Sequence, residues 1–214
     1  YKTVLFDLDG TLLNTIDDLA DSANRVCAAH GWPQYETAQY RYFVGNGIPK
    51  LVERFTRKLP QPGQLAATLA EFDKVYGAHM HDKTAPYPGM PALLARLKAA
   101  GVRMAVFSNK ADEFARAVVA RYFDADLFEV VRGALPDVPT KPAPEGAALM
   151  ARLGVEADGS VLYVGDSNVD VETATTQASL LRVLWGFRTR EELTEAGAEY
   201  LAEDTQGLEK VVLG

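Results

Sequence analysis

Three short apolar runs, each leading directly into a polar cluster, constrain the fold of this chain more than any other feature. Residues 4–6 lead into Asp7-Leu8-Asp9-Gly10-Thr11, residues 102–107 into Ser108-Asn109-Lys110, and residues 161–164 into Gly165-Asp166-Ser167. An apolar run that stops at charged residues and glycine is typical of a buried parallel strand that presents a loop at its carboxyl end. The sequence therefore predicts a parallel β-sheet.

Helix-like segments follow two of these clusters, at residues 111–121 and 168–178. Alternating strands and helices indicate βαβ units, so we predict an α/β fold with a doubly wound, mostly parallel sheet. Further strands are expected near residues 127–131 and 180–184, and a last helix at 205–214. Ligands bind outside the carboxyl ends of the strands in such sheets, so the three polar clusters are predicted to form one site.

The segment between residues 15 and 85 has a different pattern, without convincing strands. It is typical of several consecutive helices, which are expected at residues 16–29, 37–43, 48–58 and 64–81. Asn14 or Thr15 is a candidate cap of the first helix, and the stiff turn Pro86-Tyr87-Pro88-Gly89 closes the segment. We therefore predict an α/β catalytic core formed by residues 1–14 and 86–214, into which residues 15–85 are inserted as an α-helical cap.

Composition narrows the class of protein. The 214 residues carry a net charge of −7, which argues against an electrostatic nucleic-acid binder, because such a protein needs a basic face. No segment approaches the ~18 apolar residues of a membrane span, and the chain opens without the basic and apolar regions of a signal peptide. Cys27 is the only cysteine, so no intrachain disulfide is possible. We expect a cytoplasmic protein, either a monomer or a homodimer.

Four short motifs resemble, in order along the chain, those of the haloacid dehalogenase superfamily. Phe6-Asp7-Leu8-Asp9-Gly10-Thr11-Leu12 resembles the first motif, Ser108-Asn109 the second, Lys141-Pro142 the third, and Gly165-Asp166-Ser167 with Asp170 the fourth. A lone Asp-x-Asp is common, whereas four motifs on the expected elements are specific. The resemblance implies an α/β core with an inserted cap and a magnesium-dependent phosphatase activity.

The resemblance implies a role for each acidic residue. Asp7 is expected to be a nucleophile that the substrate transiently phosphorylates, and Asp9 the general acid and base. Since the phosphate ester and the attacking carboxylate are both anionic, the attack needs a divalent cation between them. Asp7 and Asp166 offer oxygen ligands that suit Mg2+. The family pattern adds the backbone carbonyl of Asp9 as a ligand and places Asp170 near the metal, behind the direct ligands or linked through water.

Fixed hydrogen-bond donors are expected around the phosphoryl group, because negative charge accumulates on its oxygens in the transition state. The Ser108 hydroxyl and the backbone N–H groups of Gly10 and Asn109 can fill this role, with Lys141 as the compensating cation. Thr11 is expected to orient the loop or Asp9. Taken singly, each residue also has a plain structural explanation, because Asp-Gly-Thr often forms a turn and an isolated lysine is usually exposed.

Residues 43–54 resemble the cap loop of phosphoglycolate phosphatases, with the sequence Phe-Val-Gly-Asn-Gly-Ile-Pro-Lys-Leu-Val-Glu-Arg. Glycines before a proline at a helix start give a loop whose N–H groups point outward, and Asn46 lies in it. Lys50 and Arg54, one turn apart, would add positive charge for a carboxylate, although a solvated helix face explains them equally well. The resemblance favours 2-phosphoglycolate as the substrate.

Other functions stay open within this pattern. The same mechanism would serve a sugar phosphate, a nucleotide or pyrophosphate, and a β-phosphoglucomutase-like mutase would return the phosphoryl group to a sugar. A binding protein that has lost turnover would keep the same motifs, and phosphonate hydrolysis would need a lid lysine such as Lys50 or Lys58. The intact motifs favour a phosphatase that acts on a small phosphorylated metabolite and binds neither nucleic acid nor a membrane.

Overall fold

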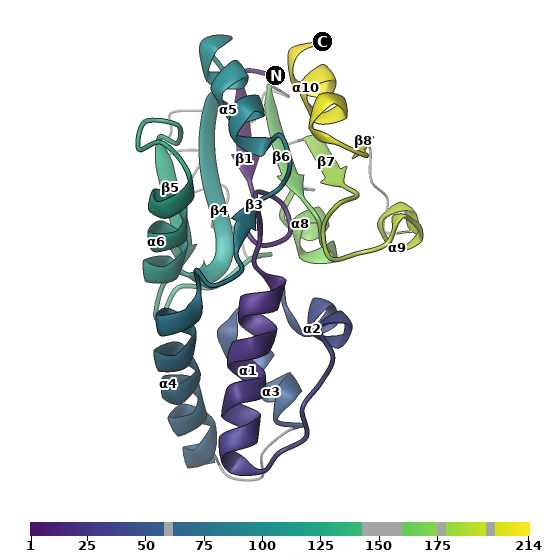
Figure 1. The fold of residues 1–214 in the computed structure, drawn as a ribbon. Coiled ribbons are helices and arrows are strands. Elements are labelled where there is room, and N and C mark those ends of the chain that lie inside the picture. Colours follow the sequence, from purple (N-terminus) through teal and green to yellow (C-terminus); the bar gives the residue numbers. More distant parts are fainter. Residues whose placement is uncertain (58–61, 143–159, 175–178, 196–199) are drawn as a thin grey trace.

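A six-stranded parallel sheet lies at the centre of the upper half of the molecule in Figure 1. The structure, a computed structural model, describes residues 1–57, 62–142, 160–174, 179–195 and 200–214. From one edge to the other, the strands are β5 (Val130–Ala134), β4 (Arg103–Ala111), β1 (Thr3–Phe6), β6 (Val161–Gly165), β7 (Ser179–Val183) and β8 (Tyr200–Ala202). Every neighbouring pair is parallel, which confirms the predicted doubly wound α/β fold.

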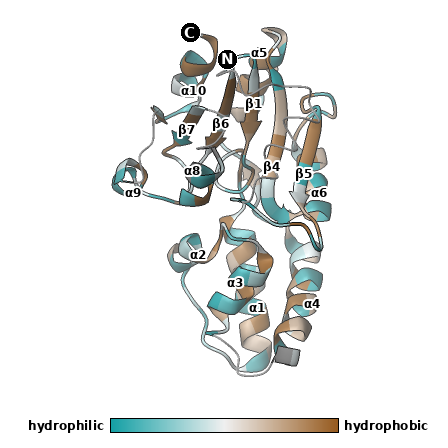
Figure 2. Ribbon diagram, turned by 180° about the vertical axis from the view of Figure 1, so that it is seen from behind, coloured by the Kyte–Doolittle hydropathy of each residue, from teal (hydrophilic) through white to brown (hydrophobic). Residues whose placement is uncertain are grey.

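The two central strands explain the apolar runs of the sequence. All residues of β1 and β6 are buried, and Thr3 lies opposite both Arg103 of β4 and Val161 of β6. A parallel strand that is covered on both faces needs apolar side chains at nearly every position. Figure 2 shows β1 and β6 as strongly hydrophobic ribbons in the middle of the sheet.

Helices cover both faces of the sheet. In Figures 1 and 2, one face carries α5 (Met90–Ala99), α6 (Asp112–Tyr122) and α10 (Thr205–Leu213), the opposite face carries α8 (Asn168–Ala174), and α9 (Arg190–Glu195) lies beside β8. Both chain ends lie at the edge of the sheet where β1 begins, and the Tyr1 amino group donates to the Val212 carbonyl at 2.6 Å. Among the described residues, no helix is both long enough and apolar enough to cross a membrane.

Four helices form a second body, here called the helical lobe, beyond the carboxyl ends of the strands (Figure 1). They are α1 (Ile16–His30), α2 (Thr37–Phe43), α3 (Ile48–Phe55) and α4 (Pro62–His79). The chain enters and leaves the lobe through a small antiparallel pair, β2 (Leu13–Asn14) and β3 (Ala85–Pro86). This pair lies at the boundaries predicted for the cap, and the division of the chain into core and cap stays a prediction.

A buried carboxylate joins the lobe to its return connection. Asp18 of α1 is 1% exposed and accepts hydrogen bonds from the backbone N–H groups of Lys83 and Thr84 at 2.8–3.1 Å. A charged acceptor makes these bonds stronger than those between neutral groups. Asp18 therefore holds α1 against the segment that leads into β3.

Two predicted strands have different limits in the structure. β4 does not stop at Phe107 but runs to Ala111, with a shift of register against β5 on the way, so Ser108-Asn109-Lys110 are part of a strand rather than of a loop. β5 begins at Val130, not near Leu127. Leu127 and Phe128 are apolar because they are buried beside a turn, in which the Leu127 N–H donates to the Asp124 carbonyl.

Helix ends also differ from the prediction. α3 ends at Phe55 rather than at residue 58, because the Thr56 hydroxyl returns to the Val52 carbonyl and Arg57 takes a positive φ of 51°. α4 spans Pro62–His79 instead of 64–81. Residues 175–178 of the predicted helix 168–178 lie outside the described residues. The short elements β2, β3, β8, α5 and α9 were not predicted.

Candidate active site

Asp7 directly follows β1 at the carboxyl edge of the sheet. Its backbone N–H donates to the Val164 carbonyl at 2.9 Å, which continues the pairing of β1 with β6 by one residue and fixes where the carboxylate lies. The Asp7 side chain is 11% exposed, and its Oδ1 lies 2.9 Å from Nζ of Lys141, which is 2% exposed. The predicted nucleophile and the predicted cation are therefore in direct contact.

Lys141 belongs to a closed network of buried polar groups. Its Nζ donates to Oδ1 of Asp170 at 2.8 Å and to the Tyr163 hydroxyl at 2.9 Å, while Ser167 donates to Oδ2 of Asp170 through N–H and hydroxyl. Burial alone would raise the pKa of Asp170, but Lys141 and Ser167 hold it below its usual value. Both Asp170 oxygens are thus occupied by protein donors, so this residue orients Lys141 and Ser167.

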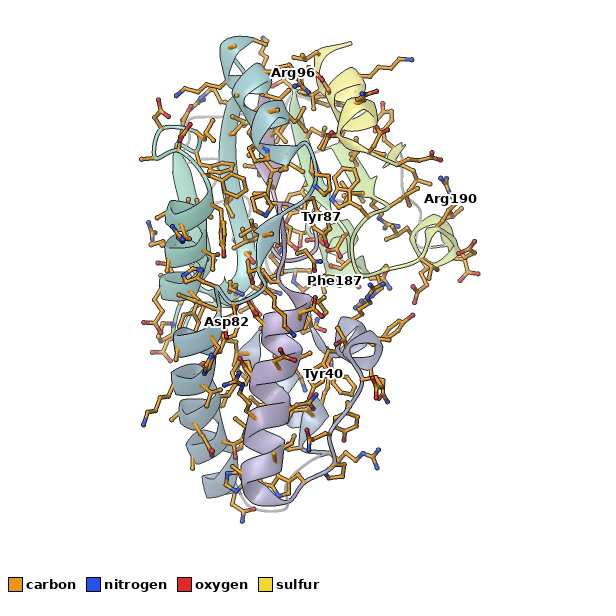
Figure 3. All side chains as sticks on the ribbon, viewed as in Figure 1. Tyr40, Asp82, Tyr87, Arg96, Phe187 and Arg190 are labelled. Carbon is orange, nitrogen blue, oxygen red and sulfur yellow. The ribbon has the colours of Figure 1, made fainter. Side chains whose placement is uncertain are left out.

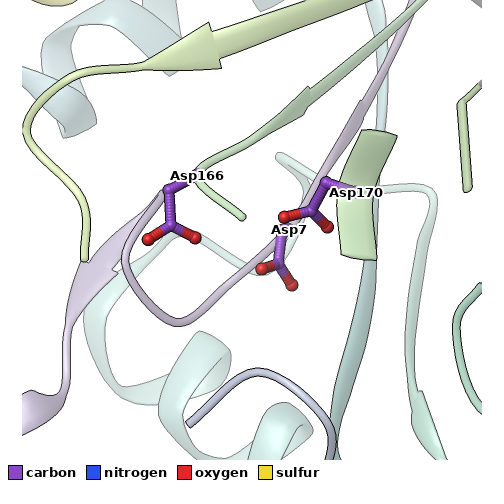
Figure 4. Close-up of side chains that lie close together, drawn as sticks. All are labelled: Asp7, Asp166 and Asp170. Carbon is purple, nitrogen blue, oxygen red and sulfur yellow. The ribbon is translucent and has the colours of Figure 1, made fainter. Parts of the chain in front are cut away.

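Asp166, which follows β6, lies close to Asp7 and Asp170 (Figure 4). One oxygen from each of the three carboxylates lies within 4.8 Å of the others. Gly10, with a φ of 83°, and Gly186 both pack against the Asp166 side chain, where a Cβ would overlap it. Only glycine fits at these two positions, because any side chain would push the carboxylate out of the cluster.

The electrostatics of this cluster favour a bound cation. Burial raises the pKa of Asp7 to about 7, with Asp170 adding to the effect and Lys141 opposing it. Burial and the charges of Asp170 and Asp7 also raise the pKa of Asp166 well above its usual value. Within the described part of the chain Asp166 forms no ion pair. A divalent cation would offset this repulsion, and an all-oxygen donor set suits Mg2+.

Lys110, for which the sequence predicts no role, is a second buried cation of the site. Its Nζ lies 3.0 Å from Oδ1 of Asp9, and the Thr15 hydroxyl donates to the same oxygen at 2.7 Å. The ammonium also lies 4.6 Å from the centre of the Tyr76 ring, which belongs to α4 of the helical lobe. Although burial would lower it, Asp9 and Tyr76 hold the pKa of Lys110 above its usual value.

Thr15 was predicted as a candidate helix cap, with Asn14 as the alternative. It occupies the N-cap position of α1, but its side chain makes no cap hydrogen bond and its hydroxyl donates to Asp9 instead. A residue at the start of the helical lobe therefore helps to orient the predicted acid. The sequence could not distinguish these two uses of the hydroxyl, because Asp9 is only six residues from Thr15 and is therefore close to it in the chain, as are the N–H groups of the first helical turn.

The second motif connects three parts of the molecule. The Asn109 side chain donates to the Gly45 carbonyl of the lobe at 3.0 Å and to the Lys141 carbonyl at 3.1 Å, and it accepts the Lys141 N–H at 2.8 Å. Ser108 is buried beside it, and its hydroxyl accepts the Lys110 N–H at 3.2 Å. Asn109 therefore fixes the position of Lys141 and of the lobe loop at the same time.

Two residues of the first loop differ from the predicted roles. The Gly10 N–H, expected to face the phosphoryl group, donates to the Leu13 carbonyl at 2.9 Å, so this donor is already used. Gly10 instead makes room for Asp166. Thr11 is fully buried; its hydroxyl has no hydrogen-bond partner among the described residues, and its carbonyl accepts the Trp185 indole N–H at 3.0 Å.

A cavity of about 40 Å³ lies between the sheet and the helical lobe. Its walls on the sheet side include Asp7, Asp9, Ser108, Asn109, Lys110 and Asp166, and its walls on the lobe side include Val44, Gly45, Gly47, Ile48 and Leu51. The structure thus brings most of the predicted site residues together around one small space. Arg188, which the sequence analysis did not single out, also lines it.

The lobe residues predicted to meet the substrate are placed differently. Lys50 lies outside the cavity, with its side chain 55% exposed and its Nζ 2.7 Å from Glu53. Asn46 lines two neighbouring cavities, and its Oδ1 accepts a hydrogen bond from Arg54 at 2.7 Å. Arg54 also donates to the Phe43 carbonyl at 2.7 Å, so it supports the loop from behind.

Comparisons with known sequences point to one family. A family model described as haloacid dehalogenase-like hydrolase matches residues 4–179. A phosphoglycolate phosphatase of Cereibacter sphaeroides is 36% identical over 176 residues, which cover 80% of this chain and 79% of the relative. A phosphoglycolate phosphatase of Vibrio cholerae is 30% identical over 219 residues, which cover 99% and 97%.

Solved structures share the whole architecture. A candidate phosphoglycolate phosphatase from Lactobacillus delbrueckii subsp. bulgaricus has a TM-score of 0.91 at 28% identity, with 100% of this chain and 99% of that chain covered. CbbY from Rhodobacter sphaeroides, solved in complex with phosphate, has a TM-score of 0.79 at 25% identity, with 95% and 94% covered. The similarity therefore includes the helical lobe as well as the sheet.

Proposed function

The chain belongs to the haloacid dehalogenase-like hydrolases and is a phosphatase of that family, and from this premise we propose that it hydrolyses 2-phosphoglycolate through a phosphorylated Asp7. The observation that carries the proposal is the contact between Asp7, which lines the same cavity as Asp9 and Asp166, and the buried Lys141. A carboxylate held at one oxygen by a lysine keeps its second oxygen for attack on phosphorus.

Asp7, Asp166 and the backbone carbonyl of Asp9 would hold the metal, with Asp170 behind them. When bound, Mg2+ would reduce the repulsion between the carboxylates and the substrate phosphate. The protein supplies the remaining positive charge through Lys141 and Lys110, both buried and both paired with carboxylates of the site.

The proposed reaction has two steps. An Asp7 oxygen forms a bond to phosphorus while the bond to the ester oxygen breaks, and Asp9 gives its proton to the departing glycolate oxygen. Asp9 then takes a proton from water, whose oxygen attacks phosphorus and releases inorganic phosphate and free Asp7. Thr15 and Lys110 hold Oδ1 of Asp9, and Oδ2 has no hydrogen-bond partner among the described residues, so Oδ2 would carry the proton.

The choice of 2-phosphoglycolate has two supports. Relatives of 30–36% identity carry the name phosphoglycolate phosphatase. The cavity of about 40 Å³ is small, and an apolar lobe wall of Val44, Ile48 and Leu51 limits the size of the leaving alcohol. A substrate with a two-carbon alcohol fits both observations better than a nucleotide or a large sugar phosphate.

The experiment that tests the proposal is phosphate release from a panel of small phosphomonoesters, with Mg2+ and with EDTA. We expect 2-phosphoglycolate to be hydrolysed in Mg2+ with the highest kcat/KM of the panel, and activity to be lost in EDTA. Preference for another ester would contradict the choice of 2-phosphoglycolate as the substrate. Activity that survives EDTA would contradict the requirement for Mg2+. An Asp7→Asn variant that still releases phosphate at a substantial rate would remove Asp7 as the nucleophile.

A further inference from the structure

Arg188 lies in the loop that follows β7 and is fixed to the candidate active site by its neighbours. The Phe187 N–H donates to Oδ2 of Asp166 at 2.6 Å, and the Trp185 indole donates to the Thr11 carbonyl at 3.0 Å. Figure 3 shows Phe187 at the junction of the sheet and the helical lobe. This loop therefore presents Arg188 to the cavity that contains Asp7.

The Arg188 guanidinium crosses from the sheet side to the helical lobe. It donates to the Arg41 carbonyl in the last turn of α2 and lies 5.1 Å from the centre of the Tyr42 ring. Neither partner carries a negative charge. Within the described residues no carboxylate forms an ion pair with Arg188; its positive charge acts on Asp166 from a distance and opposes the rise that burial gives to the pKa of Asp166.

Arg54 of α3 adds a second guanidinium, and it lines the same cavity as Arg188. Its hydrogen bonds go to the Phe43 carbonyl and the Asn46 amide oxygen, both neutral acceptors. Burial, followed by the positive charge of Arg188, holds the pKa of Arg54 below its usual value. The two guanidinium groups are thus close enough to repel each other.

A cavity of about 270 Å³ lies between these two side chains, and it adjoins the cavity of Asp7. Both cavities are lined by Val44, Gly45, Ser167 and Arg188. Glu172 is the one acidic side chain among the described residues that line the larger cavity. An anion in this space would relieve the repulsion between the two guanidinium groups, and a guanidinium fork matches a carboxylate in a bidentate pair.

We propose that Arg188, with Arg54 behind it, forms the subsite that binds the carboxylate of the leaving alcohol and so selects carboxylated phosphomonoesters. The proposal rests on the proposed function, because it takes the phosphoryl group to lie at Asp7. We assign the role of binding the substrate carboxylate to Arg188 and not to Lys50, since Lys50 is paired with Glu53 outside the cavity. Arg54 acts through Arg188 and the loop carbonyls.

The test compares two esters that differ in their carboxylate, 2-phosphoglycolate and ethyl phosphate. Dissociation constants are measured calorimetrically in an Asp7→Asn background with Mg2+, and kcat/KM is measured in the otherwise native chain. Arg188→Met should weaken binding of 2-phosphoglycolate by about 10- to 100-fold and that of ethyl phosphate by less than about threefold. Arg188→Lys should restore part of the loss.

Arg190→Met serves as the matched control, because Arg190 pairs with Glu203 and lies on the outer side of α9 (Figure 3). It should leave both affinities unchanged. Equal losses for the two esters in Arg188→Met would overturn the proposal and leave Arg188 a structural link to α2. If the native chain turns over neither ester, the proposed hydrolysis fails, while the difference in affinity still decides the role of Arg188.

Discussion

At the scale of single residues, the candidate active site is a balance of buried charges. Lys141 faces Asp7 and Asp170, and Lys110 faces Asp9, whereas Asp166 forms no ion pair within the described residues. Buried charges are costly unless they are paired, so each lysine is as much a structural requirement as a chemical one. The negative charge of Asp166 is the one that a bound metal ion would offset most.

Removing Lys110 should show how strongly the stability of the protein depends on pairing the Asp9 carboxylate with a positive charge. Lys110→Met leaves the Asp9 carboxylate without its buried partner and should lower the free energy of unfolding by about 3 kcal/mol. Adding Asp9→Asn in the same chain should recover most of that loss, because both charges are then gone. Urea unfolding measures both values. Lys98→Met is the matched control, since Lys98 pairs with the exposed Asp126 and its loss should cost less than about 1 kcal/mol. Additive losses in the double variant would contradict the coupling.

The pKa of Asp7 predicts how the metal-free protein responds to pH. Because burial raises this pKa to about 7, the folded protein favours the neutral carboxyl group. The stability that this preference contributes is fully present below the ordinary pKa of 3.8 and is lost as pH rises through about 7. In EDTA, the Tm of Asp7→Asn should therefore rise relative to that of the native chain between pH 4 and pH 7. A difference that does not change with pH would refute this assignment.

At the scale of elements, β4 shows what sequence patterns miss. Its apolar run was predicted, but its continuation through Ser108, Asn109 and Lys110 was not, because polar residues usually end a buried strand. Asn109 and Lys110 are tolerated inside the sheet because their side chains find partners from distant segments, Gly45 and Lys141 for Asn109 and Asp9 for Lys110. Such partners cannot be read from local periodicity.

The connection between lobe and sheet gives a second prediction at this scale. Asp18→Ala removes the acceptor of the Lys83 and Thr84 N–H groups and should lower the free energy of unfolding by about 3 kcal/mol. Asp21→Ala removes only the exposed pair with the Lys83 ammonium and should cost less than about 1 kcal/mol. Thermal or urea unfolding distinguishes the two, and similar losses would show that Asp18 does not hold this connection.

At the scale of the whole molecule, the sheet and the residues at its carboxyl edge were predictable, because three neighbouring parallel strands bring Asp7, Ser108 and Asp166 to one place. The helical lobe was predictable as a set of helices, but how closely it packs against the carboxyl edge of the sheet was not. The contacts of Tyr76 with Lys110 and of Arg188 with α2 depend on how the two bodies meet. The spacing of residues in the chain gave no indication of either contact.

The small cavity around Asp7, which Ile48 and Leu51 of the lobe line, should limit substrate length. Along the series 2-phosphoglycolate, 3-phosphoglycerate and 6-phosphogluconate, kcat/KM should fall by about tenfold or more overall, because larger alcohols must displace packed side chains. Ile48→Ala, which enlarges the lobe wall, should flatten this decline. Equal kcat/KM values along the series in the native chain would contradict a size limit set by the lobe.

The central place of β1 has a consequence for synthesis. Thr3 lies opposite Arg103 and Val161, so β1 is synthesised before both of its neighbouring strands and is enclosed only after the second of them has formed. Parallel pairing over such separations closes slowly, and an unpaired strand edge invites contact with other chains. A nascent chain that ends before Val161 therefore carries Asp7 on an open edge, catalytically inert and prone to association. Activity would therefore require β6 and Asp166 to be in place beside Asp7, so phosphate release would report that the centre of the sheet has formed.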